Sequence, residues 1–144
     1  MQVRITTLSE NTAGMPGVLA EWGLSILVEI DGVKVLMDTG QGISASHNAS
    51  MLGVDLAAVD KIVLSHGHYD HTGGLWYVLP LTRGVEIIAH PDIFAPKYAR
   101  YGEQARYIGI PFSREALEAF ATFTLSREPV WINKDIVTTG EIPM

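Results

Sequence analysis

Residues 65–71 read Ser65-His66-Gly67-His68-Tyr69-Asp70-His71, and this stretch places three imidazoles and one carboxylate almost side by side along the chain. The apolar run Ile62-Val63-Leu64 precedes it, and a short apolar run of this kind predicts a buried strand. Imidazole and carboxylate are ligands for zinc and for other first-row metals. The stretch therefore predicts a metal site at the C-terminal end of a strand.

The spacing of the four side chains supports this prediction. His66 and His68 alternate, so extended backbone would project both rings to the same side. Asp70 and His71 fall on the turn into a helix, where they can face a second ion. A single histidine is usually an ordinary polar or core residue, but four ligand-type side chains at this spacing favour metal binding.

The pattern His66-x-His68-x-Asp70-His71 resembles the signature of the metallo-β-lactamase superfamily. The segment Leu36–Gly40 resembles the superfamily's second-strand motif, in which a carboxylate, here Asp38, braces the metal loop. Further segments resemble a subgroup, the 7,8-dihydropterin-6-methyl-4-(β-D-ribofuranosyl)aminobenzene-5′-phosphate synthases of methanopterin biosynthesis: Trp22-Gly23-Leu24-Ser25, Asp38-Thr39-Gly40-Gln41, Leu52-Gly53-Val54-Asp55 and Thr139-Gly140-Glu141-Ile142-Pro143. The resemblance runs from about Ile5 to Pro143.

This resemblance implies an α/β (α+β) fold, namely half of an αββα sandwich with a mixed β-sheet and flanking helices. It also implies a single domain over residues 1–144 that is truncated at its C-terminus, because superfamily members continue with a second half that supplies further ligands. One half alone would leave an apolar sheet face without a cover, and such a face promotes association. We therefore expect a homo-oligomer, or a second chain that supplies the C-terminal half.

The implied function is that of a metal-dependent hydrolase or synthase-like enzyme that uses a metal-activated water. The metal ligands would be His66, His68, Asp70 and His71, with Asp70 also orienting the water and acting as general base. The metal would be zinc, with two ions if the site is completed, although iron and manganese suit the same ligands. The substrate would be a small molecule, phosphorylated in the synthase-like relatives. The alternative is a non-catalytic metal-binding remnant, or a subunit that needs a partner chain for activity.

Other polar residues keep two interpretations open. Asp38 could brace the metal loop, or it could only cap a turn. His90 follows a predicted strand and could approach the metals or the substrate at the rim of the site, or be an ordinary loop histidine. Lys97, Tyr98 and Arg106 could meet an anionic substrate group, although a solvated helix face is the simpler interpretation.

Composition excludes several other classes of protein. The net charge of −6 and the absence of a Lys/Arg run argue against nucleic-acid binding, which depends on phosphate neutralisation. The chain contains no cysteine, which excludes disulfides and thiolate ligands. No window approaches the roughly 20 apolar residues of a membrane span, and the N-terminus lacks the apolar region of a signal peptide, so we expect a cytoplasmic protein without membrane partners.

Periodicity and turn residues predict the elements along the chain. Strands are expected at Gln2–Leu8, Leu24–Ile30, Val33–Asp38, Lys61–Leu64, Val85–Ala89, Thr122–Leu125, Pro129–Ile132 and Ile136–Thr139. The dipeptide Asp31-Gly32 predicts a tight hairpin turn. Helical segments are expected around Asn48–Leu52 and Asp55–Val59, at Thr72–Leu79 with Pro80 as its stop, and at Pro91–Tyr98 and Ser113–Phe120.

Overall fold

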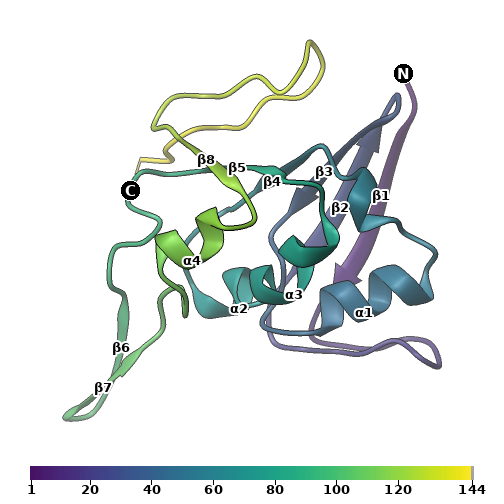
Figure 1. Cartoon of the computed structure of the whole chain (residues 1–144). Helices are drawn as coiled ribbons and strands as arrows, with labels where there is room; N and C mark the ends of the chain where they lie inside the picture. The colour runs from purple at the N-terminus through teal and green to yellow at the C-terminus, as the bar shows by residue number, and fades with distance from the viewer. Residues whose placement is uncertain (144) are drawn as a thin grey trace.

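One mixed β-sheet organises the protein, for which a computed structural model describes residues 1–143 (Figure 1). The sheet has six strands in the order β1-β2-β3-β4-β5-β8. The first three strands pair antiparallel, whereas β3, β4, β5 and β8 run parallel. Their bounds are β1 Val3–Ser9, β2 Ser25–Ile30, β3 Val33–Met37, β4 Lys61–Val63, β5 Glu86–Ala89 and β8 Thr122–Leu125. The predicted mixed α/β fold is confirmed.

Short helices lie together on one side of this sheet (Figure 1). They are α1 Ser44–Met51, α2 Tyr69–Thr72, α3 Leu75–Val78 and α4 Arg114–Glu118, with 3₁₀ turns η1 Leu56–Ala58 and η2 Leu79–Leu81. The sheet face beneath them is a row of cross-strand partners that runs through Leu27, Leu36, Ile62 and Ile87. These residues form the buried core with apolar side chains of the helices, such as Leu75 and Leu117.

Local chemistry explains the elements that were predicted correctly. Asp31 and Gly32 both have positive φ, +47° and +90°, which is the conformation of the tight turn that joins β2 to β3. Ser113 caps α4 by accepting a hydrogen bond from the amide of Ala116. Helix α1 begins earlier than predicted, because the Glu21 carboxylate accepts hydrogen bonds from the amides of Ile43 and Ser44.

Other predictions were wrong. Residues 91–98 form turns and the start of a hairpin instead of a helix, because Pro96 would interrupt helical hydrogen bonding. The hairpin, β6 Tyr98–Tyr101 with β7 Gln104–Tyr107, was not predicted. The predicted helix Thr72–Leu79 is divided into α2 and α3, and Pro80 lies inside η2 instead of stopping a helix. In place of the two last predicted strands there is one bridge, between Trp131 and Val137.

The second face of the sheet is apolar only over β1 to β3, because the row of partners that contains Val35 continues through the polar Lys61, Glu86 and Thr122. Its rows of cross-strand partners include Ile5, Val28 and Val35, and next to them Ile26, Met37 and Val63. Ile5 is 65% exposed and Met37 is 38% exposed, on a face that also carries the 48% exposed Val3. Contiguous exposed apolar surface of this kind promotes association with another polypeptide.

We expect this second face to mediate self-association of the chain. Replacing Ile5 with lysine should weaken self-association about tenfold, because burying one large aliphatic side chain contributes about 1.5 kcal/mol or more. Analytical ultracentrifugation over a concentration series measures the effect. Leu81→Lys is the matched control, since Leu81 is 52% exposed and lies in η2 outside the sheet. A wild-type chain that stays monomeric at every concentration would contradict the expectation.

Among residues 1–143, no helix is both long enough and apolar enough to cross a membrane.

Candidate metal centre

The ligand-rich loop begins where β4 ends, in the middle of the parallel part of the sheet. Beyond the strand itself, the amide of Leu64 donates to the carbonyl of Ile88, and the amide of Asp38 donates to the carbonyl of Val63. These bonds continue the sheet's alignment and bring the residue after β3 next to the loop after β4. His68 then occupies the N-cap position of α2, which carries Asp70 and His71.

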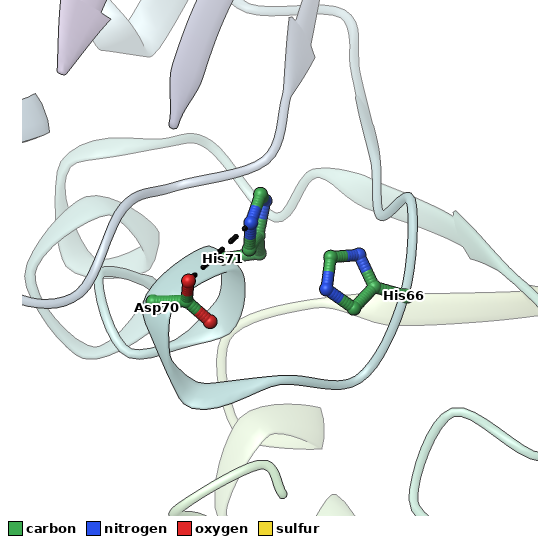
Figure 2. A group of neighbouring side chains, drawn as sticks. All are labelled: His66, Asp70 and His71. Carbon is green, nitrogen blue, oxygen red and sulfur yellow. Dashed lines mark ion pairs between the residues drawn. The ribbon is translucent and has the colours of Figure 1, made fainter. Parts of the chain in front are cut away.

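Three of the predicted ligands are brought together by the fold. Ligand atoms of His66, Asp70 and His71 lie within 4.8 Å of one another. Figure 2 shows these three side chains. His71 Nε2 is 3.6 Å from Asp70 Oδ2, and the ring centroids of His66 and His71 are 4.3 Å apart. The ring of His68 lies 4.6 Å from that of His66, although His68 is outside the mutually close group.

Asp38 forms hydrogen bonds with two residues of the metal loop, Ser65 and His71. Its side chain is buried, and its carboxylate accepts three hydrogen bonds: from the Ser65 amide at 2.8 Å, the Ser65 hydroxyl at 2.6 Å and His71 Nδ1 at 2.8 Å. Its φ of +56° is unusual for a residue other than glycine, and aspartate tolerates this region better than most. These contacts tie Ser65 and His71 to one carboxylate, which is the geometry that a bracing role for Asp38 requires, and the role itself stays a prediction.

The same carboxylate determines which imidazole nitrogens remain available. The single hydroxyl hydrogen of Ser65 points to Asp38, so Ser65 Oγ accepts from His66 Nδ1, 2.9 Å away. His71 Nδ1 donates directly to Asp38. Both rings therefore carry their proton on Nδ1 and leave Nε2 as the ligand atom. Sequence reasoning missed Ser65, although its position beside His66 and its hydroxyl were visible signals.

The pKa values of the His66 and His71 imidazoles are shifted in opposite directions. The pKa of His66 lies below 6.5 because of burial first, and then because of repulsion by the His71 and His68 rings. The pKa of His71 lies above 6.5, mainly because it donates a hydrogen bond to Asp38. A histidine braced by a carboxylate in this way is a more basic ligand, as is common among metal-binding histidines.

The donor set fits a divalent metal ion. It combines imidazole nitrogens with a carboxylate oxygen, the chemistry that suits zinc and other first-row metals. The ring nitrogens on the far side are already engaged with Asp38 or Ser65, which orients the free nitrogens. The residues present are therefore suited to hold the ion that the sequence predicted.

Close backbone contacts fix the helix that carries Asp70 and His71. A Cβ on Gly74 would lie 1.8 Å from the carbonyl oxygen of Thr39, and one on Gly23 would lie 1.7 Å from that of Asp70. Thr39 also donates to the carbonyl of His71 through both its amide and its hydroxyl. Only residues without a side chain permit these approaches.

His90 contacts polar residues outside this group. Its Nδ1 accepts from the amide of Asp92 and its Nε2 lies 3.1 Å from Arg127, which in turn pairs with Asp92 and Glu141. His47, which we did not predict as a ligand, lies 2.7 Å from the carbonyl of Gly17 through its Nε2. Among the described residues, the ligand group therefore consists of His66, Asp70 and His71, with His68 beside it.

Comparison with known proteins agrees with this geometry. The family model of the metallo-β-lactamase superfamily matches residues 23–143. The chain belongs to this superfamily. Two proteins of Methanocaldococcus jannaschii are similar over nearly all of it: an uncharacterized protein, 40% identical over 142 residues, and a 7,8-dihydropterin-6-methyl-4-(β-D-ribofuranosyl)aminobenzene-5′-phosphate synthase, 32% identical over 149 residues.

These alignments cover 96% and 97% of this metallo-β-lactamase-like chain, but 53% and 51% of the two relatives. The chain thus spans about half the length of the curated relatives. A ribonuclease Z of Methanopyrus kandleri is 40% identical over 63 residues, which are 44% of this chain and 21% of that protein. The superfamily relatives therefore include both a hydrolytic nuclease and a synthase.

Solved structures share the fold. The metallo-β-lactamase MIM-1 of Novosphingobium pentaromativorans superposes with a TM-score of 0.52 at 26% identity, over 78% of this chain and 42% of that one. A diphosphatase of the PhnP family superposes with a TM-score of 0.57 at 21% identity, over 92% of this chain and 54% of that one. The second likeness shows the fold alone.

Proposed function

We propose that this chain provides the metal-binding part of a metal-dependent hydrolase or synthase-like enzyme that acts on a small phosphorylated substrate. The observation that carries the proposal is the group formed by His66, Asp70 and His71, whose ligand atoms lie within 4.8 Å of one another above the buried Asp38 carboxylate. Membership of the metallo-β-lactamase superfamily supports the reaction class. The name of the M. jannaschii synthase, which includes a ribofuranosyl 5′-phosphate, supports the substrate class.

Each residue has a distinct part in this proposal. His66, His68, Asp70 and His71 would hold the metal, and zinc is the ion we propose, with room for two ions if further ligands are supplied. When bound, the ion would supply Lewis acidity and lower the pKa of a water molecule. Asp70 would also orient the attacking water and accept its proton as general base. Asp38 and Ser65 would keep the imidazoles in the required tautomers.

A metal-binding subunit without activity of its own is the second candidate. Catalytic zinc sites commonly combine three protein ligands with an open position, so two ions need more donors than this group provides. A further polypeptide would then have to complete the site. We propose that such a polypeptide binds the apolar part of the second sheet face, over β1 to β3.

Elemental analysis of purified protein tests the proposal. We expect about one to two zinc ions per wild-type chain, and most of this zinc should be lost in His71→Ala and in His68→Ala. His47→Ala is the matched control and should keep the wild-type content, because His47 contacts Gly17 outside the group. Equal metal content in all four proteins would reject the proposed site.

Hydrolysis of bis(p-nitrophenyl) phosphate by the zinc-loaded proteins separates the two candidates. Turnover by the wild type and by His47→Ala, but not by His71→Ala, supports an enzyme that is active alone. Bound zinc without turnover supports the subunit that needs a partner.

A further inference from the structure

The hairpin formed by β6 and β7 is attached to the metal loop, although it projects from the body of the protein (Figure 1). The amide of Tyr69, the residue between His68 and Asp70, donates to the carbonyl of Ile108 just after β7. The amide of Ile108 donates to the carbonyl of Lys97 just before β6. The end of the hairpin after β7 is thus bonded to the start of α2, and the end before β6 is bonded to that same residue, Ile108.

A second contact supports this attachment from the other side of the loop. A Cβ on Gly67 would lie 2.2 Å from the carbonyl oxygen of Ile93, so the metal loop and the turn before β6 touch along their backbones. The ammonium group of Lys97 donates to the carbonyls of Asp92, Ile93 and Ala95, which stabilises that turn. The base of the hairpin is therefore held in place next to the metal ligands.

Arg106, on this hairpin, contacts Tyr69 of the metal loop. Its guanidinium carbon lies 5.7 Å from the centroid of the Tyr69 ring, a cation–π arrangement. The register of the hairpin places Arg106 opposite Ala99, on the face shared with Tyr101 and Gln104. Arg100 lies on the opposite face, where Tyr98 and Tyr107 contact each other. Arg106 thus lies on the hairpin face opposite to that of Arg100, and its guanidinium contacts the Tyr69 ring of the metal loop.

The charge of Arg106 has no internal partner. Within residues 1–143 no carboxylate lies within ion-pair distance of it, whereas Arg114 pairs with Glu118 and Arg127 pairs with Asp92 and Glu141. Its side chain is exposed. A guanidinium that stacks on an aromatic ring keeps its N–H edge free, and that edge matches the two oxygens of a phosphate or carboxylate.

We infer that Arg106 binds an anionic oxygen group of the substrate, a phosphate or a carboxylate, beside the metal centre. This inference rests on the proposed function for the identity of the site, and it adds a residue that determines which substrates bind. The contact with Tyr69 would hold the guanidinium in place before binding, so little side-chain freedom is lost when the anion arrives.

Binding of phenyl phosphate, measured by equilibrium dialysis with phenol as the neutral comparison, tests the inference. Arg106→Gln should raise the Kd about tenfold, as expected for the loss of a charge-assisted contact at an exposed position. Arg106→Lys should show a smaller increase in Kd, because lysine keeps the positive charge but lacks the paired N–H groups of the guanidinium. Arg100→Gln is the matched control, and its Kd should equal that of the wild type. Phenol binding should not change in any variant.

Each measurement is made on metal-free and zinc-loaded protein, so that failure of the inference and failure of the proposed function can be told apart. A Kd for phenyl phosphate that rises only in the Arg106 variants supports the role of Arg106. If the wild-type chain at the same time binds no zinc, the metal proposal fails while the role of Arg106 stands. Equal Kd values for Arg106→Gln and Arg100→Gln in a chain that binds zinc normally overturn the inference alone. Absence of phenyl phosphate binding by the wild type also overturns it.

Discussion

Replacing Asp38 with asparagine is expected to weaken zinc binding by about 10- to 100-fold, the usual effect of removing a group that orients a metal ligand. Asparagine has one acceptor oxygen and one NH2 group, which only donates, so it cannot accept all three of the hydrogen bonds that the Asp38 carboxylate accepts from Ser65 and His71. The imidazole tautomers would no longer be fixed. Competition with a chromophoric chelator measures the zinc affinity. Asp135→Asn, at an exposed position, is the control and should retain wild-type affinity.

The pH dependence of unfolding gives a second measure of the same interaction. Because the pKa of His71 is raised in the folded protein, its pairing with Asp38 contributes stability that is complete below pH 6.5 and is lost as the pH rises through the raised pKa. For metal-free protein, the free energy of unfolding measured by urea titration should therefore show this decline in the wild type and lack it in Asp38→Asn. Identical pH profiles for the two proteins would contradict the role of Asp38.

Replacing Gly74 with alanine is expected to lower the free energy of unfolding by about 3 kcal/mol or more, at the upper end of overpacking effects. The added methyl group would lie 1.8 Å from the carbonyl oxygen of Thr39, so the backbone on one side must move. The backbone of Gly74 itself is ordinary, with φ −69° and ψ −13°, so the effect is purely steric. Urea unfolding followed by circular dichroism measures it.

Gly14→Ala is the matched control for this substitution. No atom lies within 4 Å of a Cβ at Gly14, so the change should leave stability unaltered or raise it slightly. Because Gly74 joins α2 to α3, movement there should also displace Asp70 and His71, and zinc affinity should fall with stability. Equal stability of the two alanine variants would contradict the prediction, because it would show that the backbone near Thr39 moves to accept the methyl group without loss of stability.

Much of the sheet could be predicted because its strands carry local signals. The apolar run at 61–64 and the Asp31-Gly32 turn identify β4 and the hairpin of β2 and β3 from neighbouring residues alone. The metal motif was equally local, since its ligands are almost consecutive. The helix predicted at residues 91–98 is wrong because Pro91 suits the first turn of a helix, whereas Pro96 removes a hydrogen bond from its interior.

Long-range contacts account for what the sequence did not reveal. The early start of α1 depends on Glu21, far away along the chain, and the attachment of β6 and β7 to Tyr69 depends on backbone groups that carry no sequence signal. The sequence by itself determined the ligand types, their spacing and the mixed sheet, because these follow from side-chain chemistry and local periodicity. Only the tertiary structure decided that Asp38 and Ser65 fix the imidazole tautomers and that Arg106 lies over the ring of Tyr69, because both require segments distant in sequence to meet.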